Sequence, residues 1–172
     1  MRPRPTPRNG ALDARRRNAT SRAMRGPRAA VRAVIVREDR LLLVNAWAGR
    51  DDLFCCPGGG IEPHASMPDN LAREVMEETG LRVRVGAPCL VNEFHDPDRP
   101  FHQVEVFFRC EVTAGEVTEG WRDPEAVVTA RRWVSRAQAE AMVEARALRP
   151  ARLPRIAWEG GFDYDPLEPV IR

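Results

Sequence analysis

The chain has 172 residues, of which 43% are hydrophobic, and a formal net charge of +2. This length suits one compact domain with its own core. No apolar run reaches the roughly 18–20 residues that a membrane-spanning helix needs, and no apolar secretory segment follows the N-terminus. Composition therefore argues against both a transmembrane protein and an ordinary secreted one.

The charge is unevenly distributed along the chain. Residues 1–28 carry nine arginines and one acid, and prolines interrupt them repeatedly. Such a segment buries too little apolar surface to offset the entropy of ordering, so we predict a disordered arginine-rich tail. Met24 is an alternative translation start that would omit most of it. A further alternative is weak, sequence-blind contact of the tail with nucleic acid phosphates.

The cysteine pattern favours reduced thiols in the cytoplasm. Cys55, Cys56, Cys89 and Cys110 have neither the spacing of a zinc site nor that of a disulfide framework. A chain of this length builds a core without disulfide bonds, and the cytoplasm keeps thiols reduced.

The segment that begins at residue 29 predicts alternating strands and helices. Alternating β-branched residues at 31–37 and 40–46 indicate a hairpin around Asp39. The other expected strands are 53–56, 81–85, 89–94, 101–112 and 130–134. One helix is expected at 66–79, between the Ser66 cap and Gly80, and another from 135 to about 148.

This pattern divides the chain into three expected segments. Residues 29–148 are expected to form the folded domain, after the tail at 1–28. Residues 149–172 contain four prolines, so an irregular C-terminal segment is expected.

The helix at 66–79 has two chemically different faces. One face is apolar and includes Leu71 and Val75. The opposite face carries Arg73, Glu74, Glu77 and Glu78. Three carboxylates within two turns repel one another unless a cation binds them. Oxygen ligands of this kind favour a hard divalent cation.

A glycine run, Gly58–Gly60, lies just before this helix. Glycine lets the backbone approach a ligand closely and leaves carbonyl and amide groups free to bind metal or phosphate. The order strand, glycine loop, capped helix and acidic face would place metal-bound carboxylates against a diphosphate.

Residues 59–81, GGIEPHASMPDNLAREVMEETGL, resemble the box of the Nudix (MutT-like) hydrolases, G-x5-E-x7-R-E-U-x-E-E-x-G-U with U aliphatic. The likeness extends over about residues 30–147. It implies an α/β fold, a Nudix-type α/β/α sandwich with a mixed β-sheet and a catalytic strand–loop–helix. It also implies hydrolysis, dependent on Mg²⁺ or Mn²⁺, of a nucleoside diphosphate linked to another moiety.

The resemblance assigns roles to residues of the box. It implies that the carboxylates of Glu74, Glu77 and Glu78 and the carbonyl of Gly58 bind metal. Glu74 is then the candidate base or base-orienting ligand, and Arg73 holds the carboxylates in position.

One box position departs from the family pattern, because Ala65 stands where the first glutamate is expected. The side chains that could replace the missing carboxylate are Glu62, His64, Asp69, Glu93 and Glu105. The departure keeps a second reading open, a degenerate Nudix domain that binds a nucleotide or a protein partner without turnover.

Substrate contacts are less clearly marked. Trp47 and Phe54 could stack on a base, although core packing is favoured for both. Glu105 is either a further metal-binding acid or a surface residue, and the acidic loop 114–126 offers more candidates. The expected partner is a small nucleotide substrate. Homodimers are common in the family, but no interface signal is visible.

Overall fold

The computed structural model describes residues 26–169. Of the predicted tail, 1–28, residues 1–25 lie outside this range, whereas Arg28 belongs to a strand and was wrongly placed in the tail. The seven strands in this range are β1 (Arg28–Arg37), β2 (Arg40–Asn45), β3 (Phe54–Cys55), β4 (Arg82–Asp96), β5 (Phe101–Ala114), β6 (Arg131–Val134) and β7 (Asp163–Pro169). The helices are α2 (Met67–Thr79), α3 (Arg136–Glu144) and α4 (Leu153–Glu159). None of these helices is long and apolar enough to cross a membrane.

The strands form one mixed sheet in the order β3-β2-β1-β5-β4-β7, with β6 paired to β2. The predicted hairpin is present, since β1 and β2 pair antiparallel through Val36 and Leu41. Strands β1 and β5 run parallel along eight residue pairs, while β4 and β5 pair antiparallel. The last strand, β7, adds to β4 in parallel.

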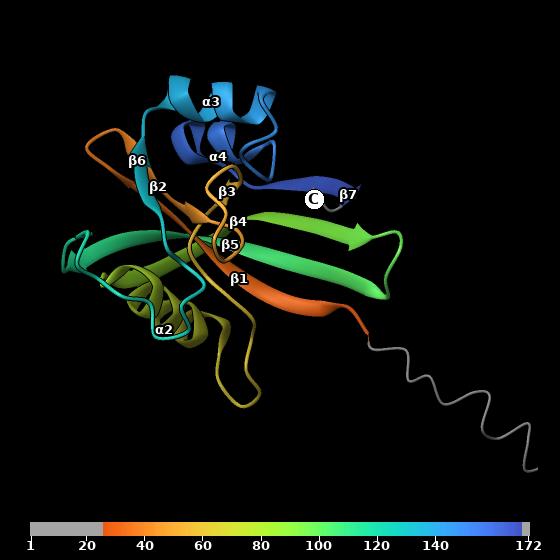
Figure 1. Ribbon diagram of the computed structural model, residues 1–172, viewed down its shortest axis with the longest axis horizontal. Coiled ribbons are helices and arrows are strands. Elements are labelled where there is room, and N and C mark those ends of the chain that lie inside the picture. Colours follow the sequence, from red (N-terminus) through yellow and green to blue (C-terminus); the bar gives the residue numbers. More distant parts are fainter. Residues whose placement is uncertain (1–25, 170–172) are drawn as a thin grey trace, which may run out of the picture.

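Helices cover both faces of this sheet (Figure 1). Helix α2 lies on one side, and α3 and α4 lie together on the other. Each face has its own apolar cluster. Leu71 and Val75 of α2 pack on Ile35, and Ile156 of α4 packs with Phe107 on the opposite face. The predicted α/β/α sandwich is confirmed.

The buried side chain of Asn45, at the end of β2, ties two loops to the sheet. Its Oδ1 accepts hydrogen bonds from the backbone N–H groups of Thr129 and Ala130, both at 2.8 Å. Its Nδ2 donates to the carbonyls of Trp47 and Val127. Both loops lead to the region described below as the candidate site.

We expect Asn45→Ala to lower the free energy of unfolding by about 2–3 kcal/mol, because it leaves buried backbone groups without partners. Urea denaturation measures this loss. Thr129→Ala, an exposed change in the same loop, is the control and should stay within about 0.5 kcal/mol of the unmodified chain. Equal stability of the two variants would contradict this role.

The C-terminal part differs from the prediction, because residues 149–172 are not irregular throughout. They contain α4 and β7. Pro154 lies in the first turn of α4, where a missing N–H costs nothing. Leu153 and Ile156 are fully buried, and Arg152 forms ion pairs with Asp163 and Asp165. The prolines of this segment therefore did not prevent regular secondary structure, and the prediction of an irregular segment was wrong.

Two other boundaries also differ. The strands expected at 81–85 and 89–94 form the single strand β4, which continues through register shifts around Pro88. Helix α3 ends at Glu144 rather than near residue 148. The backbone at Ala147 and Arg149 instead hydrogen-bonds to Phe54 of β3, which stops the helix.

Candidate active site

Helix α2 is held at both ends as its sequence predicts. The Ser66 hydroxyl accepts a hydrogen bond from the Asp69 N–H. At the other end, Gly80 adopts a left-handed conformation, with φ of 76°, and donates its N–H to the Met76 carbonyl. With the apolar face against the sheet, the charged face turns toward the glycine loop.

The glycine loop runs along the edge of β1. Val31 donates its N–H to the Gly59 carbonyl, and Ala33 donates to the Pro57 carbonyl. Gly58 has φ of +139°, and a Cβ there would overlap the carbonyl oxygen of Val31. A Cβ on Gly59 would overlap the carboxylate of Glu74. Glycine at these positions therefore allows α2 and the loop to approach each other.

Glu78 is the most buried carboxylate of α2. Its Oε2 accepts a hydrogen bond of 2.7 Å from the N–H of Gly58. Burial raises the pKa of Glu78 to about 8, although the charge of Arg32 and the Gly58 hydrogen bond oppose the shift. Burial also raises the pKa of Glu74, which lies half-buried beside Gly59.

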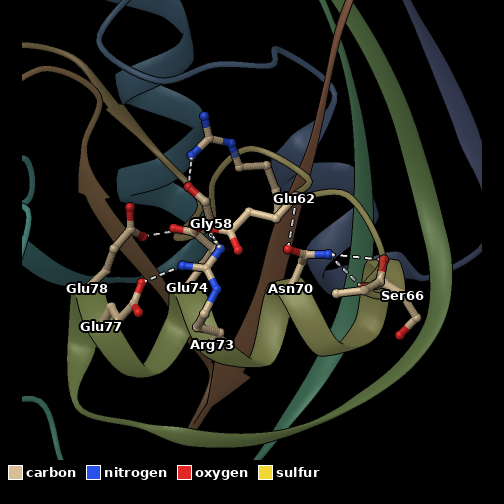
Figure 2. Close-up of polar contacts among 10 residues, drawn as sticks. Gly58, Glu62, Ser66, Asn70, Arg73, Glu74, Glu77 and Glu78 are labelled. Atoms are coloured by element: carbon tan, nitrogen blue, oxygen red, sulfur yellow. Dashed lines mark hydrogen bonds and ion pairs between the residues drawn. The ribbon is translucent and has the colours of Figure 1, made fainter.

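Arg73 links the acidic side chains, as Figure 2 shows. Its Nη1 donates to Glu77 and its Nη2 to Glu74, each at 2.7 Å. The Nη2 atom also lies 3.3 Å from Glu62. One guanidinium thus partly neutralises three carboxylates and fixes the direction in which they point.

Arg32 of β1 forms another wall of the site. Its Nη1 donates to the Gly58 carbonyl at 2.5 Å, and its Nε donates to the carboxylate of Glu105 at 2.8 Å. Glu105 is only 5% exposed, so the reading of Glu105 as a surface residue was wrong. Its carboxylate faces Arg32 rather than the acids of α2.

The loop before β6 supplies further acids to the same region as the carboxylates of α2. Asp123 accepts hydrogen bonds from the N–H groups of Val127 and Val128 and shapes this loop. The charges of Asp123 and Glu125 help to raise the pKa values of Glu78 and Glu74 respectively. Sequence analysis named Asp123 only as one of several acids in this loop, because the course of a loop cannot be derived from sequence. The one local signal was Asp123-Pro124, since Asp-Pro is a usual turn signal.

These groups surround a cleft of about 640 Å³, which we call the acid cleft. Among its lining residues, two arginines, Arg28 and Arg32, face six acids. The acids are Glu62, Glu74, Glu77, Glu78, Asp123 and Glu125. The excess of negative charge and the oxygen donors fit a hard divalent cation. Within residues 26–169, however, no three acidic, histidine or cysteine side chains converge as they stand to hold an ion.

The residues that could replace the missing box glutamate are scattered. Glu62 lines the acid cleft. Asp69 instead accepts a hydrogen bond from the Ser66 hydroxyl, and Glu93 contacts His102 and Tyr164. His64 is exposed and lies outside the lining of the acid cleft. Glu105, as described above, pairs with Arg32.

Ala65 itself lies in the loop before α2, and its backbone carbonyl accepts a hydrogen bond from Asn70 Nδ2. Asn70 Oδ1 accepts one from the N–H of Glu62 (Figure 2). Asn70 therefore fixes the loop that presents Glu62.

A second cavity of about 400 Å³ adjoins the acid cleft, and we call it the aromatic pocket. Arg28, Arg32 and Trp47 line both cavities. The core position favoured for Trp47 was wrong, because the side chain is 43% exposed. Phe54 is a core residue, 1% exposed, and it also lines this pocket.

Comparison with known proteins identifies the class. The family model of the NUDIX domain matches residues 26–158, so the chain belongs to the NUDIX family. A NUDIX hydrolase from Nitrosomonas europaea has the same fold, with a TM-score of 0.64 at 22% identity over 81% of this chain and 93% of that one. An ADP-ribose pyrophosphatase from Streptococcus suis gives 0.60 at 24% identity, over 81% and 99%.

Curated relatives match a shorter region. Bacillus subtilis (strain 168) YjhB, provisionally named an ADP-ribose pyrophosphatase, is 32% identical over 97 residues, which are 55% of this chain and 46% of that protein. The human diphosphoinositol polyphosphate phosphohydrolase 3-alpha is 33% identical over 97 residues, 56% of each. The match thus spans about half the length of these relatives.

Proposed function

We propose that this protein is a divalent-metal-dependent hydrolase of a nucleoside diphosphate linked to another moiety. The observation that carries the proposal is the acid cleft, where Glu74 and Glu78 of α2 lie against Gly58 and Gly59. Membership of the NUDIX family supports it. The relatives are named for activities on ADP-ribose or on diphosphoinositol polyphosphates. Both compounds contain a phosphate anhydride, as the proposed substrate does.

Glu74, Glu77, Glu78 and the carbonyl of Gly58 are the proposed ligands of Mg²⁺ or Mn²⁺. When bound, the ion supplies positive charge to the phosphoryl oxygens as a Lewis acid. Arg73 positions Glu74 and Glu77 through the two hydrogen bonds described above. Glu74 is the proposed base, because its carboxylate lies beside Gly59 and can accept the proton of an attacking water.

Arg32 is also a positioning residue of the proposed site. Its hydrogen bonds to the Gly58 carbonyl and to Glu105 fix the glycine loop on β1. Its charge also lowers the energy of the ionised form of Glu78, against the effect of burial. We therefore assign Arg32 to positioning the loop and stabilising the buried negative charge.

The test is release of phosphate-containing products from ADP-ribose, ADP-sugars, (d)NTPs, diadenosine polyphosphates and a diphosphoinositol polyphosphate. We expect turnover of at least one compound with Mg²⁺ or Mn²⁺. Turnover should disappear with EDTA and return when the ion is added back, because the acid cleft has an excess of carboxylates. Turnover that persists in EDTA would contradict the proposed metal dependence.

A second function, nucleotide binding without turnover, is favoured by Ala65 alone. Binding of nucleotides without hydrolysis of any compound in the panel would support that function instead. The cytoplasmic location, the weak contact of the tail with nucleic acid and a homodimer stay predictions.

A further inference from the structure

The last turn of α2 has backbone carbonyl groups that need partners from outside the helix, as every helix end does. In a longer helix, Leu81 would donate its N–H to the Glu77 carbonyl, but here this N–H donates to the Thr79 hydroxyl. Helix α2 ends at Thr79 and β4 begins at Arg82, so no helical N–H lies opposite the Glu78 carbonyl either. The two carbonyls therefore belong to Glu77 and Glu78, both proposed metal ligands.

Two side chains from outside the helix donate to these carbonyls. The indole N–H of Trp121 donates to the Glu77 carbonyl at 2.8 Å, and the Nε of Arg131 donates to the Glu78 carbonyl. Trp121 lies in the loop before β6, residues 115–130, and Arg131 is the first residue of β6. Donors and positive charge suit the negative end of the helix dipole, and α2 itself has no basic residue in its last turn.

The loop before β6 also packs closely against the end of α2. The ring of Trp121 lies on Gly80, where a Cβ would come within 2.9 Å of the ring. Gly115, at the start of the loop, approaches so closely that a Cβ there would overlap the carbonyl oxygen of Gly80. Hydrogen bonds and contact together therefore fix this loop to the last turn of α2.

Beyond Trp121, the same loop passes along the acid cleft. Asp123 and Glu125 line the cleft, and the loop keeps its shape because Asp123 accepts hydrogen bonds from the N–H groups of Val127 and Val128. The acids of α2 and those of the loop thus form two walls that carry the same charge. Like charges repel one another, so the two walls would move apart unless other contacts held them.

We propose that Trp121 and Arg131 are positioning residues, which hold the loop before β6 against the last turn of α2 and so keep the acids on both sides of the acid cleft in place for a divalent cation. The inference rests on the proposed function, because it concerns the metal ligands assigned there. Neither residue is among those that line the acid cleft, so both act through the backbone of Glu77 and Glu78. Ligands that are fixed before binding lose less conformational freedom when the ion binds.

The experiment measures the binding of Mn²⁺ alone by isothermal titration calorimetry, so that no substrate or turnover is needed. Trp121→Phe keeps an aromatic ring and removes the indole N–H. The matched control is Trp158→Phe on α4, at the other face of the sheet, because the Trp158 indole also donates one hydrogen bond, of 2.7 Å to Asp39. In thermal unfolding with EDTA, each variant should unfold within about 4 °C of the unmodified chain.

We expect Trp121→Phe to weaken Mn²⁺ binding about fivefold to tenfold, the effect of losing one hydrogen bond, and Trp158→Phe to bind Mn²⁺ as the unmodified chain does. The Mn²⁺ concentration that gives half-maximal hydrolysis should rise by the same factor in Trp121→Phe. A side chain that served only the fold would lower the Tm and leave the Mn²⁺ affinity of the folded protein unchanged.

Arg131→Met is the second variant, and it carries the test if Trp121→Phe does not fold. It removes the donor to the Glu78 carbonyl together with a positive charge that interacts with Asp123 and Glu78. Loss of this charge alone would tighten the binding of a cation. Weaker Mn²⁺ binding by Arg131→Met would therefore support positioning rather than a change of charge.

Equal Mn²⁺ affinity in Trp121→Phe and the unmodified chain would overturn the inference, and so would equal or tighter binding by Arg131→Met. The proposed function would survive either result if the unmodified chain hydrolyses a compound of the panel. Weaker binding by both variants, without hydrolysis of any compound, would keep the inference and overturn the enzyme. An unmodified chain that binds no Mn²⁺ would overturn both.

Discussion

Glu78→Gln is expected to lower kcat of metal-dependent hydrolysis about a thousandfold, because it removes a proposed metal-binding carboxylate from the acid cleft. The glutamine amide oxygen can still accept the hydrogen bond that Gly58 donates. Burial disfavours the ionised form of Glu78, so a neutral side chain should leave the Tm of the metal-free protein unchanged or raise it.

The measurement is steady-state kinetics on the best compound of the panel, with thermal unfolding in EDTA beside it. Glu140→Gln on α3 is the matched control, since that carboxylate is exposed and pairs with Arg136. It should leave both readouts unchanged. Loss of activity together with a large fall in Tm would show that Glu78 serves the fold rather than the reaction, and retained activity would remove it from the site.

Gly58→Ala is expected to lower the free energy of unfolding by about 3–4 kcal/mol. The φ of +139° is strained for any residue with a Cβ, and that Cβ would overlap the backbone of β1. Backbone cannot move aside without breaking the hydrogen bonds that hold the loop to Val31 and Ala33.

The control for this change is Gly60→Ala, two residues further along the same loop. The three atoms nearest to its Cβ would all belong to the guanidinium of Arg28, which can move, and its φ is not in the left-handed region. Urea denaturation of the two variants separates them, with a loss of less than about 1 kcal/mol expected for Gly60→Ala. If both lose the same amount, the close approach of Gly58 to β1 is not what requires glycine.

Much of the fold was predictable because its signals are local. The cap at Ser66, the stop at Gly80 and the two faces of α2 follow from side-chain chemistry within a few residues. The same holds for the hairpin of β1 and β2. Order in the C-terminal segment was missed because it depends on distant partners, such as the pairing of β7 with β4.

In the candidate site, too, local contacts could be predicted from sequence and distant contacts could not. Arg73 and the acids of α2 lie at helical spacing, so their contact could be expected from sequence. Asp123 and Trp47 reach the acid cleft from two loops that Asn45 joins, and the contact of Asn45 with Val127 spans 82 residues of sequence. The ion pair of Arg32 with Glu105 joins two residues that lie 73 positions apart in sequence, and no local pattern indicates it.

The C-terminal segment contributes to one of the two cavities and not to the other. Among the residues described, none after Val127 lines the acid cleft, whereas the aromatic pocket takes part of its wall from Arg149, Pro150, Glu168 and Pro169. Substitutions in this last segment can therefore reshape the aromatic pocket without touching the acids on α2. In evolutionary terms, the wall of this pocket is free to vary while the acidic helix is inherited unchanged.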